Sequence, residues 1–325
     1  MRLTAILCSV ALTISAAPGA GQPLPAEPVI RPGPVGAAAG TGPWPAIAEG
    51  RADAPGYTLY RPLVPRRAPL PLVLWGNGGC RDNGLGASHF LREIASHGYI
   101  VIANGNPRRE EPADQAAGPT PPQPPSTPRP PPNPASPPAD DETSVAQLLG
   151  AIDWAAAANA RAGDALRRRI DLRRIAVMGH SCGGLQALAA GADPRIRTVM
   201  AFASGVYNRP SGGRSRVAIA KEDLRRLHTP VAYILGGPGD IAYSNGMDDF
   251  ARIDHVPVFA GNLPVGHGGT FRVANGGDWA RVAVAWLDWQ LKADAGGRAW
   301  FAGPHCRLCT TFGWSVQRKQ FSQVP

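Results

Sequence analysis

The chain has 325 residues, enough for a single α/β domain with tails and insertions, and it contains 39 glycines and 35 prolines. Its formal net charge is +9, yet only three of its 33 basic residues are lysines, which indicates a GC-rich genome rather than a nucleic-acid partner. The densest basic cluster, residues 167–174, falls on an expected exposed connection. We therefore expect no nucleic-acid partner. We also expect no membrane span, since no apolar stretch of the chain reaches the roughly 18 residues that a membrane helix needs.

The amino-terminal segment has the features of a secretion signal. Arg2 precedes an apolar run from Leu3 to Ile14, and small residues follow. We predict that residues 1–20 are a signal peptide and that the mature protein is secreted or periplasmic. Residues 21–56 are rich in proline, glycine and alanine, so we expect an extended or disordered lead-in.

Strands and helices then alternate along the chain. We expect strands at residues 57–61 and 70–75, a helix at 87–97 and a strand at 99–103. The second of these strands ends in a glycine-rich loop, GNGGC, at residues 76–80.

A proline-rich insertion interrupts this pattern at residues 111–139. Proline neither donates to a sheet ladder nor continues a helix, so we expect a spacer that contributes little to the core. Asp140 or Asp141 is the expected cap of a helix that continues through Trp154, because apolar residues recur there on one face.

Residues 175–185, IAVMGHSCGGL, are the most informative stretch. A short apolar run predicts a buried strand, and the small residues after Gly183 predict a helix. Between them, residues 179–183 form the G-x-S-x-G pattern of a nucleophile elbow, with Ser181 at its centre. We expect Ser181 to be a nucleophile at the carboxyl end of a strand, beside a helix amino terminus.

The remaining residues continue the alternation. We expect strands at 198–203, 231–235 and 256–259, with the last of these closing the sheet, and helices at 221–227 and 278–294. This order indicates an α/β fold with a mainly parallel sheet covered by helices on both faces, and sites form at the strands' carboxyl ends. The catalytic domain is predicted to span residues 57–294, followed by a tail, residues 295–325, that contains a CxxC motif.

A serine nucleophile needs a base, and the base needs a carboxylate to orient it. Among seven histidines, His267 is the one on a glycine-flanked loop after the expected last strand. Asp240 follows the strand at 231–235 and is the preferred carboxylate; Asp248, Asp249 and Asp254 compete but fall in an expected helix and its exit, where exposed acids are common.

Acyl transfer also needs two donors to a developing oxyanion. The residue after the nucleophile supplies one, which is the amide of Cys182. The glycine-rich loop at 76–80 is expected to supply the other, and we assign it to Asn77.

Cys8 lies in the predicted signal peptide, so cleavage would leave four cysteines, and the compartment reached by export permits disulfides. Cys80 and Cys182 flank the two proposed donors, so we predict that they form one disulfide and that Cys306 and Cys309 form another. A zinc site at the CxxC is disfavoured because no second CxxC or nearby His pair completes it, and a redox pair because no thioredoxin-like context surrounds it.

Residues 57–294 resemble the α/β-hydrolase superfamily. The motifs WGNGGC, GHSCGG, GGPGD and GHGG are most similar to its dienelactone-hydrolase-like and cutinase-like polyester hydrolase branch. The resemblance implies carboxylic ester hydrolysis by Ser181, Asp240 and His267 through an acyl-enzyme, without metal or cofactor. The chain departs from it in three places: Ser181 stands where dienelactone hydrolases have cysteine, and the proline-rich insertion and CxxC tail lie outside the pattern.

The substrate remains open at this point. The expected lid position, residues 204–220, is rich in glycine, arginine and serine, so we expect an open site that favours short-chain or aryl esters, small or polymeric. Acyl transfer to another alcohol, or a binding scaffold without catalysis, are the alternatives, and the oligomeric state is not indicated.

Overall fold

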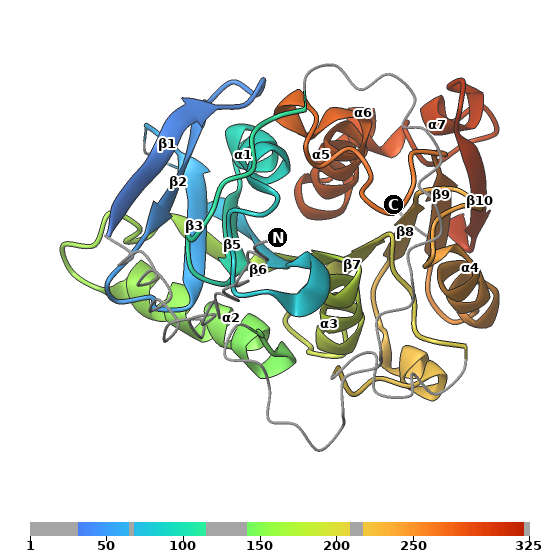
Figure 1. Ribbon diagram of the computed structural model, residues 1–325, viewed down its shortest axis with the longest axis horizontal. Helices are drawn as coiled ribbons and strands as arrows, with labels where there is room; N and C mark the ends of the chain where they lie inside the picture. Colours follow the sequence, from blue (N-terminus) through green and yellow to red (C-terminus); the bar gives the residue numbers. More distant parts are fainter. Residues whose placement is uncertain (1–31, 65–67, 115–141, 209–216, 322–325) are drawn as a thin grey trace, which may run out of the picture.

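The computed structural model describes residues 32–64, 68–114, 142–208 and 217–321 (Figure 1). Its centre is a ten-stranded sheet in the order β1-β2-β3-β5-β4-β6-β7-β8-β9-β10. The strands are β1 (Gly33–Ala39), β2 (Ala46–Gly50), β3 (Tyr57–Pro62), β4 (Leu70–Gly76), β5 (Ile100–Asn104), β6 (Ile170–His180), β7 (Ile196–Phe202), β8 (Val231–Leu235), β9 (Val258–Asn262) and β10 (Ser315–Lys319).

The six central strands, β5-β4-β6-β7-β8-β9 in sheet order, run parallel to one another. The strands at both edges, β1 to β3 on one side and β10 on the other, pair antiparallel. Every residue of β4, β5, β8 and β9 is buried. Strands buried on both faces need helices above and below them, which explains their continuous apolar sequences. The predicted α/β class with a mostly parallel sheet is therefore confirmed.

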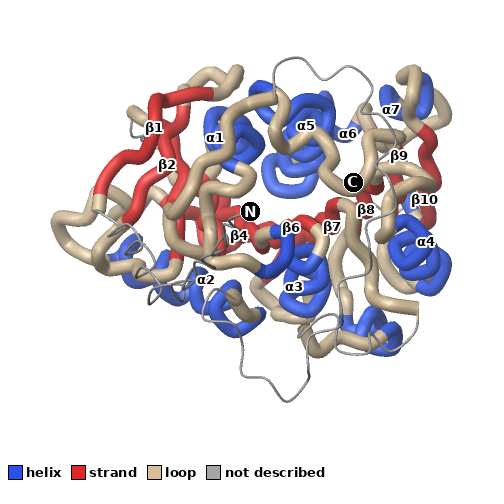
Figure 2. Tube along the Cα trace, in the orientation of Figure 1, coloured by secondary structure: helices blue, strands red, loops and turns tan. Residues whose placement is uncertain are grey.

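Helices cover both faces of the sheet (Figures 1 and 2). One face carries α1 (Ser88–Ser96), α5 (Gly277–Lys292) and α6 (Ala295–Arg298), with the core around Phe90, Trp279 and Trp286. The other face carries α2 (Val145–Ala160), α3 (Cys182–Ala190) and α4 (Tyr243–Arg252), with a core that includes Leu148, Leu185 and Phe250. Shorter elements are η1 (Gly78–Cys80), η2 (Lys221–Arg226), η3 (Ala274–Gly276) and α7 (Arg307–Thr310).

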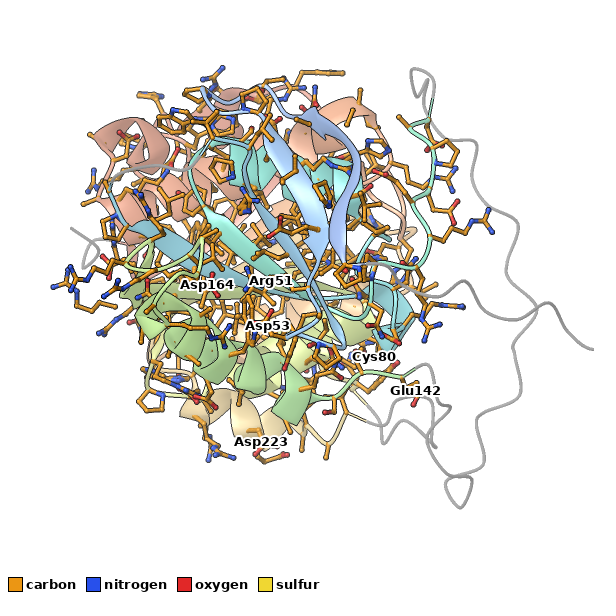
Figure 3. All side chains as sticks on the ribbon, turned by 90° about the vertical axis from the view of Figure 1, so that its left-hand side faces the viewer. Arg51, Asp53, Cys80, Glu142, Asp164 and Asp223 are labelled. Carbon is orange, nitrogen blue, oxygen red and sulfur yellow. A yellow bond between two sulfur atoms is a disulfide. The ribbon has the colours of Figure 1, made fainter. Side chains whose placement is uncertain are left out.

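The expected lead-in at residues 21–56 is wrong for its second half, which forms β1 and β2. All five residues of β2 are buried, so its alanines contribute to the core despite their small size. Arg51, directly after β2, pairs with two carboxylates: its guanidinium contacts Asp53 at 2.9 Å and Asp164, whose side chain is 2% exposed, at 2.7 Å (Figure 3). A long-range ion pair of this kind leaves no periodic trace in the sequence.

Two further boundaries differ from the predictions. β10, in the expected tail, pairs with β9 along five residues, so β9 does not close the sheet and the domain extends beyond residue 294. The cap of α2 is Ser144, whose side chain accepts a hydrogen bond from the Gln147 amide, and not Asp140 or Asp141.

The predicted signal peptide and nearly all of the predicted proline-rich insertion lie outside the described residues. Within the described ranges, no helix has both the length and the apolar character needed to cross a bilayer.

Candidate active site

Ser181 occupies a strained turn between β6 and α3. Its φ is +53° with ψ of −117°, a conformation that non-glycine residues rarely adopt. Two glycines make the turn possible: an added Cβ on Gly179 would lie 2.1 Å from the Gly183 carbonyl oxygen, and one on Gly183 would lie 2.1 Å from the Gly76 carbonyl carbon. The G-x-S-x-G spacing is therefore a steric requirement of this packing, and it presents the serine at the sheet's carboxyl edge.

The structure brings the three predicted residues into one hydrogen-bonded chain. His267 Nε2 lies 2.9 Å from Ser181 Oγ, and His267 Nδ1 lies 2.7 Å from Asp240 Oδ1. Ser181 follows β6, Asp240 follows β8 and His267 follows β9, so three parallel strands deliver the groups to the same edge. An imidazole held between a hydroxyl and a carboxylate can accept the hydroxyl proton while the carboxylate stabilises its charge.

Asp240 is held as a carboxylate. It is 4% exposed, and burial alone would raise its pKa, but hydrogen bonds from His267 and from the amides of Ala242 and Gly236 keep the pKa below its usual value. The competing acids do not reach His267. Asp249, expected to be exposed, is instead fully buried, and it accepts hydrogen bonds from the Val206 amide at 2.7 Å and from Lys221 at 2.6 Å.

The two predicted oxyanion donors come from adjacent segments. Cys182 is the first residue of α3, and the backbone N–H groups in the first turn of a helix have no acceptor within the helix. Asn77 follows β4, and its amide nitrogen would lie 2.6 Å from a Cβ added at Gly183. The predicted disulfide between Cys80 and Cys182 is confirmed, with a Cα–Cα distance of 5.2 Å, and it joins the loop of one donor to the helix of the other.

Side chains also fix the loop that carries Asn77. The Asn77 side-chain amide donates to the Arg81 carbonyl at 3.0 Å and to the Asn104 carbonyl at the end of β5. The carbonyl of Cys80 accepts from the Thr143 amide at 2.7 Å and from its hydroxyl at 3.0 Å. The loop is thus held from three sides before any substrate arrives.

His180 is a residue of the site that the sequence analysis passed over. Its Nε2 donates to the His267 carbonyl at 2.8 Å, and its ring packs against the rings of His267 and Phe271 with centroid distances of 5.2 and 4.9 Å. Burial and the neighbouring imidazole of His267 lower the pKa of His180 to about 4. It is therefore neutral near pH 7 and can keep the loop of His267 in place. Its place directly before Ser181 in the G-x-S-x-G pattern is the feature of the sequence that could have indicated this role.

A small pocket opens beside Ser181 and His267. Its volume is about 60 Å³, and its lining includes Leu185, Ala203, Ser204, Tyr207, Ile241 and Asn245. Behind the lining, Lys221 donates to the Asn245 carbonyl at 3.1 Å and pairs with the buried Asp249, whose pKa burial raises to about 6. This buried pair ties the segment around Val206 to α4 and so sets one wall of the pocket.

Cys306 and Cys309 form the second predicted disulfide. Among the residues that the structure describes, no three His, Cys, Asp or Glu side chains are grouped to hold a metal. The chain matches no protein-family model, and a search of curated proteins gave no match either.

Proposed function

We propose that the protein is a serine hydrolase of the α/β-hydrolase type that cleaves carboxylic esters through an acyl-enzyme on Ser181. The observation that carries the proposal is the unbroken chain from Ser181 Oγ through His267 to Asp240, with distances of 2.9 and 2.7 Å. Distances this short allow proton transfer without rearrangement of the side chains.

In the first half of the proposed reaction, His267 Nε2 takes the hydroxyl proton while Ser181 Oγ bonds to the ester carbonyl carbon. The carbonyl oxygen becomes an oxyanion and accepts hydrogen bonds from the amides of Asn77 and Cys182. As the C–O bond to the alcohol breaks, His267 returns its proton to the departing oxygen. Asp240 stays ionised throughout and orients the imidazole.

In the second half, water takes the place of the alcohol. His267 removes one proton from it, the resulting oxygen nucleophile attacks the acyl carbon, and the bond to Ser181 Oγ breaks as His267 reprotonates the serine. The products are a carboxylic acid and the free enzyme.

The pocket favours a small acyl group. Its volume of about 60 Å³ is well below the roughly 300–1,000 Å³ typical of ligand sites. Each methylene that stays in water forfeits about 0.8 kcal/mol of possible binding. Short-chain and aryl esters should therefore be preferred to long-chain ones.

Active-serine labelling tests the proposal. A fluorophosphonate should modify Ser181 alone, because only a serine activated by a base reacts readily. Label at another serine, or none, would remove the hydrolase proposal. Butyrate and palmitate esters of one alcohol should differ in kcat/KM in favour of butyrate, and added alcohols in the same assay distinguish hydrolysis from acyl transfer by their products.

A further inference from the structure

The tail presents an exposed aromatic side chain at the edge of the sheet that carries the candidate active site. Among the described residues, four large hydrophobic side chains are exposed, namely Leu63, Val64, Ile241 and Phe312. Ile241 is 73% exposed and lines the pocket at Ser181. Phe312 is fully exposed and belongs to a tail segment that the proposed chemistry does not use.

The strand directions place Ile241 and Phe312 at the same edge of the sheet. β8 and β9 are parallel, so the loops after Leu235 and after Asn262 leave at the carboxyl edge. β10 is antiparallel to β9, with Ser315 opposite Asn262, so the residues just before Ser315 lie at that edge too. By contrast, Leu63 and Val64 follow β3, which runs antiparallel to β5, and they leave at the opposite edge.

Contacts connect the three loops into one surface. A Cβ added at Gly237 would lie 2.8 Å from Pro264, and one added at Gly313 would lie 3.4 Å from Leu263. The loop of residues 236–241 thus packs on residues 263–266, which in turn pack on the tail. We call this surface, formed by residues 238–241, 263–265 and 311–314, the apolar rim.

A turn holds Phe312 outward. The Trp314 amide donates to the Thr311 carbonyl at 3.2 Å, and Gly313 has a φ of +86°, which a type II turn requires at its third position. The Thr311 hydroxyl donates to the Arg307 carbonyl at 2.7 Å, and the Cys306–Cys309 disulfide closes the preceding turn. These contacts hold Phe312 at the tip of a turn, where its side chain is exposed to solvent.

The exposed residues of the rim carry no charge, in a chain that has 57 charged residues, 33 basic and 24 acidic. Residues 263–265 and 311–314 include no Asp, Glu, Lys or Arg, and Asp240, the one acidic residue of 238–241, is buried. An exposed apolar surface without charge is stabilised by leaving water, so it marks a place where an apolar, uncharged material can bind. A surface that binds anionic lipid would instead carry lysines and arginines around its apolar residues.

We infer that the apolar rim docks the enzyme on an uncharged, water-insoluble ester, with Phe312 as the tail's anchor and Ile241 continuing the contact into the pocket. The inference rests on the proposed ester hydrolysis. It gives the tail, with its disulfide, a role in holding the substrate surface beside Ser181.

Adsorption of the Ser181→Ala protein to polycaprolactone particles tests the inference without any turnover. Phe312→Ser in that background should lower the partition coefficient about tenfold, which corresponds to about 1.4 kcal/mol and is within reach of one buried phenylalanine. Val64→Ser, a hydrophobic removal at the opposite edge, is the matched control and should leave adsorption unchanged.

Turnover of soluble 4-nitrophenyl acetate by the Phe312→Ser enzyme separates the two proposals. Unchanged soluble turnover with weaker adsorption supports the rim. Equal adsorption of Phe312→Ser and the parent, an equal loss in Val64→Ser, stronger binding to anionic phosphatidylglycerol vesicles than to the polyester, or a changed mass by sedimentation would each overturn it. Absence of turnover in the parent enzyme would reject the hydrolase and leave the adsorption result standing.

Discussion

The elbow region, residues 76–84 and 179–186, and the tail region, residues 295–321, each contain one disulfide but use it differently. Cys80–Cys182 spans 102 residues and joins two loops that the chain must bring together. Cys306–Cys309 spans three residues and closes a local turn. The comparison indicates that the elbow depends on long-range constraints, whereas the tail is held mainly by β10 and by buried residues such as Phe301 and Leu308.

The largest expected effect is at the centre of the elbow region. Ser181→Ala should lower kcat/KM on a soluble ester at least about a thousandfold, because the nucleophile is lost while the oxyanion donors remain. Ser315→Ala, an exposed serine of the tail region, is the control and should behave like the parent. Ser181→Ala enzyme with more than a tenth of the parental activity would contradict the role of this serine.

The next effect separates the two disulfides. The double variant Cys80→Ser/Cys182→Ser should lose about tenfold to a hundredfold in kcat with little change in KM, since the amides that it releases act on the transition state. A loop of 100 residues is worth about 4.7 kcal/mol in the chain-entropy description, so the melting temperature should fall by roughly 10 °C. A kcat equal to that of the parent would show that the backbone amides of Asn77 and Cys182 keep their positions without the Cys80–Cys182 disulfide.

His180 tests whether side-chain contacts also organise the elbow region. His180→Ala should lower kcat about tenfold, because the loop of His267 loses the hydrogen bond to its carbonyl, and His180→Gln should recover part of the loss by offering an amide donor. His255 makes a similar bond to the Leu227 carbonyl at 2.8 Å on another part of the fold, so His255→Ala is the matched control. An equal loss of kcat in His255→Ala would point to general destabilisation.

The lowered pKa of His180 also predicts how stability changes with pH. The unfolded chain binds a proton at this residue near pH 6.5, whereas the folded protein resists protonation until about pH 4. The contribution of His180 to stability is therefore complete above pH 6.5 and is lost as the pH falls toward 4. Melting temperatures measured between pH 4 and 7 should decline less steeply for His180→Gln than for the parent; parallel curves would contradict this.

The smallest effect is expected in the tail. Cys306→Ser/Cys309→Ser should change kcat on a soluble ester less than twofold, because a bond across three residues removes little entropy from the unfolded chain and touches no reacting group. The assay is the one used for the elbow disulfide. A loss as large as that of Cys80→Ser/Cys182→Ser would erase the distinction between the two regions.

The sequence predicted the parts of the fold that local patterns specify. Burial on both faces requires the continuous apolar sequences of strands β4 to β9, and the close packing around Ser181 requires the glycine spacing of its turn. The edge strands β1 and β2 were missed because alanine and glycine give no such pattern. Their position depends on contacts such as Arg51 with Asp164, which lie 2.7 Å apart but far apart in the chain.

The same limit applies to single residues of the site. Asp240 and Asp249 both follow β8 within 14 residues and are both acidic, yet one orients His267 and the other is buried against Lys221. Asp240 could be selected because it follows β8 directly, whereas the burial of Asp249 depends on how α4 packs, which a helical period cannot show. His180 was overlooked for a related reason, since its partner is a backbone carbonyl 87 residues later.

The disulfide pairing has a consequence for how the protein matures. Both bonds join cysteines that are consecutive among the four in the described chain, Cys80 with Cys182 and Cys306 with Cys309. If the chain is exported from its amino end, as residues 1–20 predict, it meets an oxidant one cysteine at a time, and pairing in order of emergence gives both native bonds. Maturation by that route needs an oxidant but no reshuffling of wrong pairs, and the loop of Cys80 is joined to the elbow before the tail has crossed.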